Sequence, residues 1–439
     1  MKKPKFQSPT GMHDILPEDQ KYFQKIHEVV AELSDFYNFK KIETPILEQT
    51  ELFSKGIGLA TDIVQKEMFS FKTKGGDYLT MRPEGTAPIV RAFIENGMSN
   101  LPQPVKLWYF GPFFRYERPQ TGRYRQFWQF GFEVFGEESP VIDAQIIQIF
   151  YNILKELKLK NLIIEINSIG DSFCRPYYKK ILANYFNSRA ESLCANCKRR
   201  LKENPLRILD CKEEKCQRII SQAPQIIDHL CENCHKHFKE VLEFLDEIEL
   251  PYHLNPYLVR GLDYYTRTVF EIFSEEKEEI KPEAREEKTE SSLPVKNALA
   301  GGGRYDSLIK VLGGKNIPAV GAAAGIERIV ALAKQKAIRF PKEIRHQVFL
   351  AQLGGLARRK SLKLVEEFRQ EGVSIAESLG RDSLKAQLKI ADKLGVIYAL
   401  VLGQKEALDG TIIIRDMRSG QQEIIKLEKV VKEIKRRTK

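Results

Sequence analysis

The spacing of apolar side chains after Pro17 predicts a long amphipathic helix. Apolar residues recur there every three or four positions, a period that places them on one face of an α-helix. The stripe consists of Tyr22, Phe23, Ile26, Val29, Val30, Leu33 and Phe36. We predict a helix of about five turns whose apolar face is buried.

The residues that follow this helix alternate between apolar and polar positions, as β-strands do. Gly75 and Gly76 predict a tight turn between two of these stretches. The strand-like stretches are 40–47, 67–73, 78–84, 105–117 and 162–167. Because tight turns join neighbouring antiparallel strands, this half of the chain predicts an antiparallel sheet.

Two later segments depart from this pattern. The cysteine-bearing stretch at about 172–250 has a sequence pattern typical of helices and turns, which indicates a helical insertion. Residues 275–290 contain eight acidic and four basic residues and almost no apolar ones. Such a segment cannot bury enough surface to order itself, so we predict a solvated, flexible loop at 275–296.

Beyond Pro341, strand-like and helix-like stretches alternate. Their order is strand 347–354, helix 356–371, strand 373–376, helix 382–394, strands 398–403 and 410–416, and a final helix. Alternation of this kind indicates a separate α/β domain with a mostly parallel or mixed sheet. A chain of 439 residues has room for such domains, and we predict boundaries at 1–335 and 345–439.

Composition and charge narrow the class of protein. No apolar run approaches the roughly 20 residues that span a bilayer, and the basic N-terminus lacks the apolar core of a secretory signal. We therefore expect a cytoplasmic protein without membrane contact. The net charge is +11, and residues 345–439 hold 20 Lys+Arg against 12 Asp+Glu. This surplus favours nucleic-acid contact, although a solvated basic surface without a partner has the same composition.

The densest chemical feature lies at 113–135, where four arginines stand among aromatic residues and two glutamates. They are Arg115, Arg118, Arg123 and Arg125. A guanidinium group can donate two parallel hydrogen bonds to phosphate oxygens, and an aromatic ring can stack on a nucleobase. Since the sequence has no Walker-type or GxGxxG loop, this cluster is the best candidate for a triphosphate site. The structural alternative is an exposed hairpin with a basic edge.

Two further clusters carry polar or glycine residues. The stretch at 258–272 can hold a small polar substrate, or its residues can pack on one another as a hairpin; it contains Arg260, Asp263, Tyr264, Tyr265 and Arg267. The stretch at 298–332 is rich in glycine, which lets the backbone approach a ligand or a neighbouring helix closely.

Six of the seven cysteines are clustered in the predicted insertion. They are Cys194, Cys197, Cys211, Cys216, Cys231 and Cys234. The first and last pairs have the CxxC spacing of a four-thiolate zinc site, and clustering in a reducing compartment favours metal ligation over disulfides. The sequence leaves structural zinc open, and it predicts no metal ligand in the active site.

The motifs, in their order along the chain, resemble those of a known family. They are RPEGT at 82–86, FRYERPQTGRYRQFWQFGFEVFG at 114–136, LVRGLDYYTRTVFE at 258–271, GGGRYD at 301–306 and AVGAAAGIER at 319–328. This series resembles the successive motifs of histidyl-tRNA synthetases, a class II family. The GMHDILP start and the basic C-terminal domain extend the resemblance to nearly the whole chain.

The resemblance implies an α+β fold, with a class II antiparallel-sheet catalytic domain, a helical insertion and a C-terminal α/β anticodon-binding domain. It also implies a reaction in two steps: histidine and ATP form histidyl-adenylate and pyrophosphate, and histidine is then transferred to the 3′ end of tRNA(His). ATP with Mg²⁺ and a homodimer are expected. The element around Pro45 and the first helix would line the dimer contact, although apolar stripes more often serve the core of one chain.

By motif position, five residues are expected to bind ATP. Arg115 would contact the α-phosphate, Arg123 the outer phosphates and Arg328 the region of the γ-phosphate. Phe127 would stack on adenine, with Glu117 nearby.

Arg260 is expected to be the key electrostatic catalyst, together with Arg115. The expected histidine-binding residues are Glu84, Gly85, Thr86, Gln129, Glu133, Tyr264 and Tyr265. Within this set, Glu84, Thr86 and Gln129 would hold the α-amino group. Glu133 and Tyr265 would hold the imidazole, whose two nitrogens an acid and a phenol can satisfy.

Two other classes of protein compete with this interpretation. A regulatory paralogue keeps the synthetase fold without aminoacylation, but such paralogues generally lack the anticodon domain that this sequence has. A plain nucleic-acid-binding module would not need Glu84, Gln129 and Glu133 in a pocket. Histidine-dependent exchange between ATP and pyrophosphate separates both from a synthetase.

Overall fold

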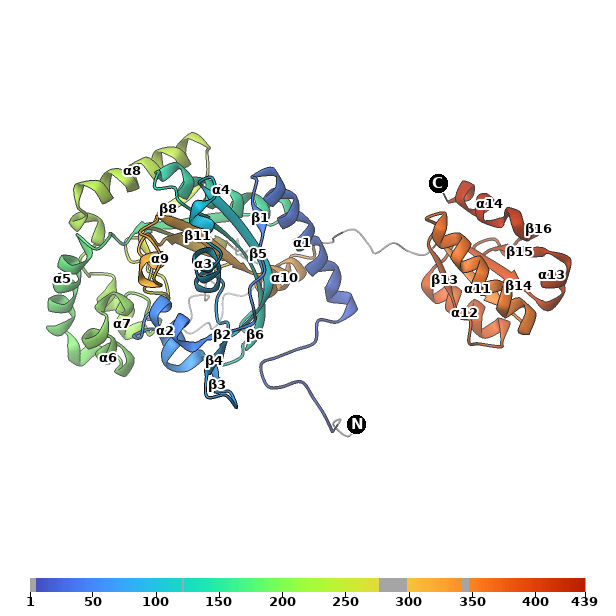
Figure 1. Ribbon diagram of the computed structural model, residues 1–439, viewed down its shortest axis with the longest axis horizontal. Coiled ribbons are helices and arrows are strands. Elements are labelled where there is room, and N and C mark those ends of the chain that lie inside the picture. The colour runs from blue at the N-terminus through green and yellow to red at the C-terminus, as the bar shows by residue number, and fades with distance from the viewer. Residues whose placement is uncertain (1–4, 121, 276–297, 339, 341–346, 439) are drawn as a thin grey trace, which may run out of the picture. The chain divides into compact units, whose positions relative to one another are not determined.

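The computed structural model describes residues 5–120, 122–275, 298–338, 340 and 347–438 (Figure 1). The chain divides into two compact units, Met1–Phe340 and Pro341–Lys439. Of the segment predicted as an acidic loop, residues 276–296 lie outside the described residues. Among the described helices, none is both long and apolar enough to cross a membrane.

The first unit is built on an eight-stranded sheet with the order β1-β5-β6-β11-β10-β9-β7-β8. The edge pairs β1–β5 and β7–β8 run parallel, and the pairs between them are antiparallel. The strands are β1 (Lys40–Lys41), β5 (Val105–Phe114), β6 (Gln126–Phe135), β7 (Leu162–Ser168), β8 (Tyr252–Leu254), β9 (Thr266–Ser274), β10 (Ala300–Arg304) and β11 (Ala319–Gly325). The predicted antiparallel sheet is confirmed.

Helices cover this sheet and enclose its main core. They are α1 (Pro17–Phe36), α4 (Pro140–Glu156), α8 (Glu232–Glu247) and α10 (Ile326–Gln335). The predicted first helix is confirmed, and Phe23, Ile26 and Val30 from its stripe are buried in the same core as Phe130 and Phe150. These stripe residues therefore serve the core of their own chain.

A smaller sheet, in the order β2-β4-β3, carries the next elements. Its strands are β2 (Leu47–Gln49), β3 (Phe69–Lys72) and β4 (Tyr78–Met81), beside α2 (Thr50–Ile57), η1 (Ile63–Glu67), α3 (Thr86–Glu95), η2 (Met98–Asn100) and α9 (Leu308–Val311). The prediction of one continuous strand at 40–47 was wrong. Pro45 has no N–H to donate, and the carbonyl oxygen of Thr44 accepts from Arg82 Nη1 at 2.7 Å, so the chain leaves one sheet and enters the other.

The stretch between β7 and β8 is helical, as predicted. Its elements are α5 (Arg175–Asn187), η3 (Ala190–Ser192), α6 (Ala195–Glu203), η4 (Pro205–Ile208), α7 (Glu214–Ile220), η5 (Ile226–His229) and α8. Figure 1 shows α5, α6 and α7 gathered at one side of the unit, next to α2. Arg200 Nη2, on α6, lies 2.6 Å from Asp62 Oδ2, which stands between α2 and η1. This ion pair joins the helical stretch to the segment that follows α2.

The glycine-rich strands β10 and β11 lie in the middle of the large sheet. A side chain at Gly302 would meet the backbone of Gly321, and one at Gly303 would meet the carbonyl oxygen of Thr268. The expected close approach therefore occurs at these two positions, but to neighbouring strands and not to a helix. At the end of β10, the fully buried Arg304 binds Asp143 of α4 at 2.5 Å and fixes the sheet to that helix.

The second unit holds a five-stranded sheet in the order β13-β12-β14-β15-β16, parallel in its first three strands and antiparallel in the rest. Its elements are β12 (Val348–Gln352), α11 (Gly355–Gln370), β13 (Ile375–Glu377), α12 (Leu384–Leu394), β14 (Tyr398–Leu402), α13 (Gln404–Asp409), β15 (Thr411–Asp416), β16 (Gln422–Lys426), η6 (Leu427–Lys429) and α14 (Val430–Arg437). This confirms the mixed α/β prediction. Strand β16 was missed because it is a mostly exposed edge strand with few apolar residues.

Candidate active site

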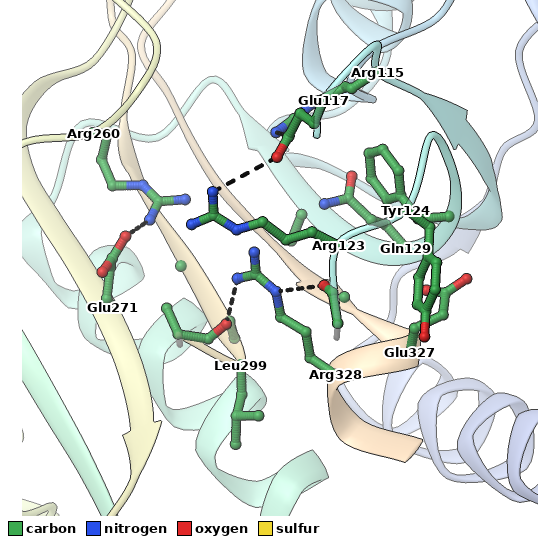
Figure 2. Close-up of a pocket in the computed structure, with 17 residues that line it drawn as sticks. Arg115, Glu117, Arg123, Tyr124, Gln129, Arg260, Glu271, Leu299, Glu327 and Arg328 are labelled. Carbon is green, nitrogen blue, oxygen red and sulfur yellow. Dashed lines mark hydrogen bonds and ion pairs between the residues drawn. The ribbon is translucent and has the colours of Figure 1, made fainter. Parts of the chain in front are cut away.

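An open pocket lies on the large sheet, where β6, β10 and β11 meet the hairpin that joins β5 to β6 (Figure 2). Its empty volume, which includes space open to solvent, is about 690 Å³. We call it the arginine pocket after the four cations that line it, Arg115, Arg123, Arg260 and Arg328. Four guanidinium groups in one pocket favour an anionic ligand with several oxygen atoms.

Arg115 and Arg123 share one carboxylate in this pocket. Glu117 lies 3.8 Å from Arg115 Nη1 and 3.7 Å from Arg123 Nη1. Arg115 Nε donates to the carbonyl oxygen of Pro83 at 2.8 Å, and its guanidinium lies 5.3 Å from the centre of the Phe127 ring. Since both ion pairs are long, the two guanidinium groups keep donors for a ligand.

Arg328 is held at the start of α10 by backbone oxygens. Its Nη1 donates to Ala298 at 2.8 Å and its Nε to Gly122 at 3.2 Å, so the helix and the hairpin meet through this side chain (Figure 2). Burial lowers its pKa, and the nearby cations Arg123 and Arg115 lower it further. An anion in the pocket would relieve this repulsion.

Arg260 enters the pocket from the segment before β9 and forms an ion pair with Glu271 of β9. Burial opposes its charge, but Glu271 and the tyrosines 264 and 265 outweigh burial and raise the pKa of Arg260. Its guanidinium occupies the space above Gly301, where an added Cβ would lie 2.6 Å from Arg260 Nη1. Among the described residues, the buried Nε atoms of Arg260 and Arg123 have no hydrogen-bond partner. Both are buried donors that the described residues leave unsatisfied.

A second group of polar residues is buried beside this pocket. Glu84 accepts from the backbone N–H of Thr86 and of Ala87, each at 2.8 Å. The hydroxyl of Thr86 then donates to Glu133 Oε1 at 2.8 Å, and the Tyr305 hydroxyl donates to Oε2 of the same carboxylate. We call this group the acid–tyrosine cluster, which comprises Glu84, Thr86, Glu133, Tyr264, Tyr265 and Tyr305.

The carboxylates of the cluster bind protons more tightly than usual. Burial raises the pKa of Glu133 to about 8, although hydrogen bonds from Tyr305 and Thr86 oppose the shift. Burial likewise raises the pKa of Glu84 against its two backbone donors. Tyr265 connects the cluster to the arginine pocket, because the Arg260 guanidinium lies 6.0 Å from the centre of its ring.

The predicted site residues fall into two adjoining sets. Lining the arginine pocket are Arg115, Glu117, Arg123, Phe127, Gln129, Arg260 and Arg328. Gly85 stands with the acid–tyrosine cluster, where the ring of Tyr109 occupies the space that a side chain at this position would fill. The remaining predicted residues, Glu84, Thr86, Glu133, Tyr264 and Tyr265, belong to the cluster itself.

Sequence reasoning missed several partners of these residues. Tyr305 lies in the GGGRYD motif that was recognised, but no role was assigned to it. Glu271 and Glu327 also line the pocket. Both oxygens of Glu327 accept from the N–H of Trp128, and burial raises its pKa to about 7. The end of the LVRGLDYYTRTVFE motif was the available signal for Glu271.

Comparison with known proteins agrees with this geometry. Residues 11–329 match the histidyl-tRNA synthetase family and residues 347–437 match an anticodon binding domain. The histidine–tRNA ligases of Desulforamulus reducens and Caldicellulosiruptor saccharolyticus are each 44% identical to the chain, and each match covers 98% of the chain and 99% of the relative.

A solved structure is similar over the same length. The apo histidyl-tRNA synthetase of S. aureus has 35% sequence identity and a TM-score of 0.78, covering 98% of this chain and 99% of that one. The resemblance inferred from the five motifs is confirmed. Matches to both units at this identity show that the chain belongs to the histidyl-tRNA synthetase family.

Proposed function

We propose that the chain activates histidine with ATP in its first unit and then transfers histidine to tRNA(His). In the first step, a carboxylate oxygen of histidine attacks the α-phosphorus of ATP, and the bond to pyrophosphate breaks. In the second, the terminal adenosine of the tRNA attacks the adenylate and releases AMP. The observation that carries this proposal is the contact between the two parts of the site, an arginine pocket for phosphates and an acid–tyrosine cluster for a small polar substrate.

The arginine pocket is proposed to bind ATP. Arg115 contacts the α-phosphate, Arg123 the outer phosphates and Arg328 the γ-phosphate, while adenine stacks on Phe127 beside Glu117. Three observations support these roles: the residues line one pocket, the ion pairs of Arg115 and Arg123 with Glu117 are long, and the Nε of Arg123 lacks a partner among the described residues. Phosphate oxygens satisfy such donors with charge-assisted hydrogen bonds.

Arg260 is proposed to stabilise the charge that develops at the α-phosphate. Its guanidinium is buried, remains charged through Glu271, and has an Nε donor without a partner among the described residues. A fixed donor in a site of low dielectric stabilises a transition state more than a solvated one does. Arg115, which lines the same pocket, is proposed to assist it.

Histidine is proposed to bind where the pocket meets the acid–tyrosine cluster. Glu84, Thr86 and Gln129 hold its α-amino group, and Glu133 and Tyr265 hold its imidazole, with Gly85 and Tyr264 completing the wall. The cluster is already ordered by hydrogen bonds, so binding does not have to fix these side chains. Polar pairing of both imidazole nitrogens would discriminate strongly against apolar amino acids.

Mg²⁺ is proposed to accompany ATP. The carboxylates that line the pocket, Glu117, Glu271 and Glu327, supply the oxygen atoms that this cation prefers. Each is already engaged by an arginine or a backbone N–H, so we propose that phosphates hold most of the coordination sphere and that Glu117 and Glu271 contribute. The bound ion would neutralise charge on the outer phosphates.

The other proposed partners concern regions outside the pocket. The second unit, at 345–439 by sequence, would read the anticodon, and the hairpin at 116–126 would approach the acceptor end. A homodimer would form around Pro45, where Ile46 and Leu47 are 43% and 40% exposed. We place the chain in the cytoplasm, where tRNA and ATP are present.

The test is ATP–pyrophosphate exchange by the purified full-length chain, run separately with each standard amino acid. Exchange with histidine alone is the expected result, followed by charging of tRNA(His). A well-folded chain that exchanges with no amino acid would support the regulatory paralogue. Exchange that requires another amino acid would overturn the assignment of the cluster.

A further inference from the structure

The cysteines of the helical region separate into two groups in the fold. One contains Cys194, Cys197, Cys211 and Cys216; the other contains Cys231 and Cys234 with Cys174 and Asp171. The sequence showed two pairs with ligand-like spacing but left open which cysteines lie together, and the fold puts the two CxxC pairs in different groups. Each pair instead finds its partners in a different segment, and Cys174 and Asp171 were not considered because they precede the cluster in sequence.

The first group has the geometry of a tetrahedral metal site. Its four sulfur atoms all lie within 4.8 Å of one another, and Cys194 Sγ is 3.8 Å from Cys211 Sγ. A zinc ion bound at about 2.3 Å by four thiolates sets its sulfur atoms about 3.8 Å apart. A disulfide would need about 2.05 Å, and all seven cysteines are free.

Backbone N–H groups also point at these sulfur atoms. The N–H of Cys197 donates to Cys194 Sγ at 3.4 Å, and the N–H of Cys194 donates to Cys216 Sγ at 3.3 Å. Such donors stabilise the negatively charged thiolate, which is the form of cysteine that binds metal. Cys197 and Cys216 are fully buried, so the group is enclosed on most sides.

We propose that Cys194, Cys197, Cys211 and Cys216 bind a structural zinc ion. The local sequence explains the need for one. Helix α6 is strongly polar and only nine residues long, and α7 has seven residues, so neither can bury much apolar surface. A metal that joins the start of α6 to the segment before and within α7 would hold these two short helices to the core beside them.

This zinc site would also support the catalytic loop. The turn between the two cysteine pairs contains Asn204 and Arg207. Arg207 Nη1 donates to the carbonyl oxygen of Arg260 at 2.9 Å, and Asn204 Nδ2 donates to Asp263 at 3.1 Å. Loss of the metal would loosen this turn and, through it, the backbone that carries Arg260. The link to catalysis rests on the proposed function, whereas metal binding itself does not.

The second group is an independent site of the same kind. Asp171 Oδ1 lies 3.6 Å from Cys174 Sγ, and Cys174 Sγ accepts the N–H of Asp171 at 3.4 Å. Cys174 and Cys234 are buried, and a side chain at Gly170 would lie 2.5 Å from Cys174 Sγ. Three thiolates and one carboxylate are suitable zinc ligands. We infer a second zinc ion, which would join the end of β7 to the start of α8.

Metal analysis of the full-length chain tests both sites. The protein is purified without chelator, and zinc and iron are measured by mass spectrometry against protein concentration. The two groups predict about two zinc ions per chain. One zinc would overturn one site, and none would overturn both. Iron in place of zinc would overturn the identity of the metal. Fewer than seven free thiols in the denatured, chelated protein would indicate disulfides and overturn the proposal.

Substitutions then assign each ion to its group. Cys197→Ser should remove one zinc and Cys234→Ser the other, each lowering the thermal midpoint. Asn196→Ser and His235→Ser are matched controls, because these exposed neighbours should keep both ions. If a cysteine variant does not fold, cobalt replacement in the unaltered chain decides instead, since the proposal requires the absorption bands of tetrahedral cobalt thiolate.

The link to the catalytic loop has its own measurement. Cys197→Ser should lower histidine-dependent exchange on the order of tenfold, and Arg207→Ala should do the same while keeping both zinc ions. Unchanged exchange in a folded, zinc-depleted chain would overturn the link and leave the metal sites intact. Absence of exchange in the unaltered, zinc-loaded chain would contradict the proposed function and not the metal sites.

Discussion

The arginine pocket is open and Glu117 forms only long ion pairs in it, whereas the acid–tyrosine cluster beside it is buried and each oxygen of its two carboxylates already accepts a hydrogen bond. Glu117 is 3.7 and 3.8 Å from its two arginines, while Glu84 and Glu133 accept hydrogen bonds of 2.8 Å. The difference fits two kinds of ligand. A flexible, highly charged ligand can be drawn to donors that remain partly free, but a small neutral side chain is selected by groups already fixed in place.

Removal of the Arg260 side chain should have the largest effect on this arrangement. Arg260→Ala should slow adenylate formation by about 10²–10³-fold, the usual consequence of losing one fixed donor at a developing charge. Histidine-dependent exchange measures it. Arg189→Ala, at an exposed arginine between α5 and η3, is the control. Near-normal exchange by folded Arg260→Ala protein would show that the pocket works without this cation.

The next effect should come from the far wall of the pocket. Arg328→Ala should raise the KM for ATP by about 10–100-fold, as expected for a lost charge-assisted hydrogen bond of about 1.5–3 kcal/mol. The KM for histidine should change little, because Arg328 forms its hydrogen bonds with Gly122 and Ala298 and, within the described residues, with no member of the acid–tyrosine cluster. Equal increases in both constants would mean that the two parts of the site are not separable.

A converse change tests the cluster. Tyr305→Phe removes the hydroxyl that donates to Glu133 and keeps the ring. We expect the KM for histidine to rise by about tenfold, equivalent to about 1.4 kcal/mol, with little change in the KM for ATP. Tyr78→Phe, at a position 62% exposed, is the matched control. A larger effect on ATP than on histidine would reverse the assignment.

The smallest expected effect is on stability as a function of pH. Folded Glu133 keeps its proton up to a pKa of about 8, whereas the ordinary value is 4.5. Between these values the folded chain binds more protons than the unfolded one, so the free energy of unfolding falls as the pH rises. Glu133→Gln should reduce this fall, raising the relative thermal midpoint at pH 8 by about 2–4 °C. The exposed Glu243→Gln variant should retain the slope of the unaltered chain.

Much of the fold could be predicted because it depends on local patterns. The three-to-four-residue period of α1 and the strand-like stretch at 105–117, which covers β5, were sufficient to predict these elements, whereas β6 was not among the predicted strands. Five of the predicted site residues, from Arg115 to Gln129, also come from one hairpin, so the sequence already places them close together. A single residue can interrupt such a pattern. The sequence predicted one strand at 40–47, but the structure has two short strands, β1 and β2, with Pro45 between them.

Pairings between distant segments could not be predicted. Glu133 and Tyr305 are 172 positions apart, and nothing in either motif indicates that β6 and the end of β10 meet. The two cysteine groups likewise depend on pairings between distant segments. Spacing identifies Cys194–Cys197 and Cys231–Cys234 as ligand-like pairs, but the fold decides which segments supply the other two ligands.

The parallel pairing of β7 with β8 limits how far the chain could be shortened. A parallel pair needs a crossover of a dozen or more residues, and α8 provides it, with Phe238, Val241 and Leu245 packed in the main core. A shortened chain that replaced α5, α6 and α7 with a linker could keep the β7–β8 pair only if α8 stayed. It would still lose the contacts of Asn204 and Arg207 with the segment that carries Arg260.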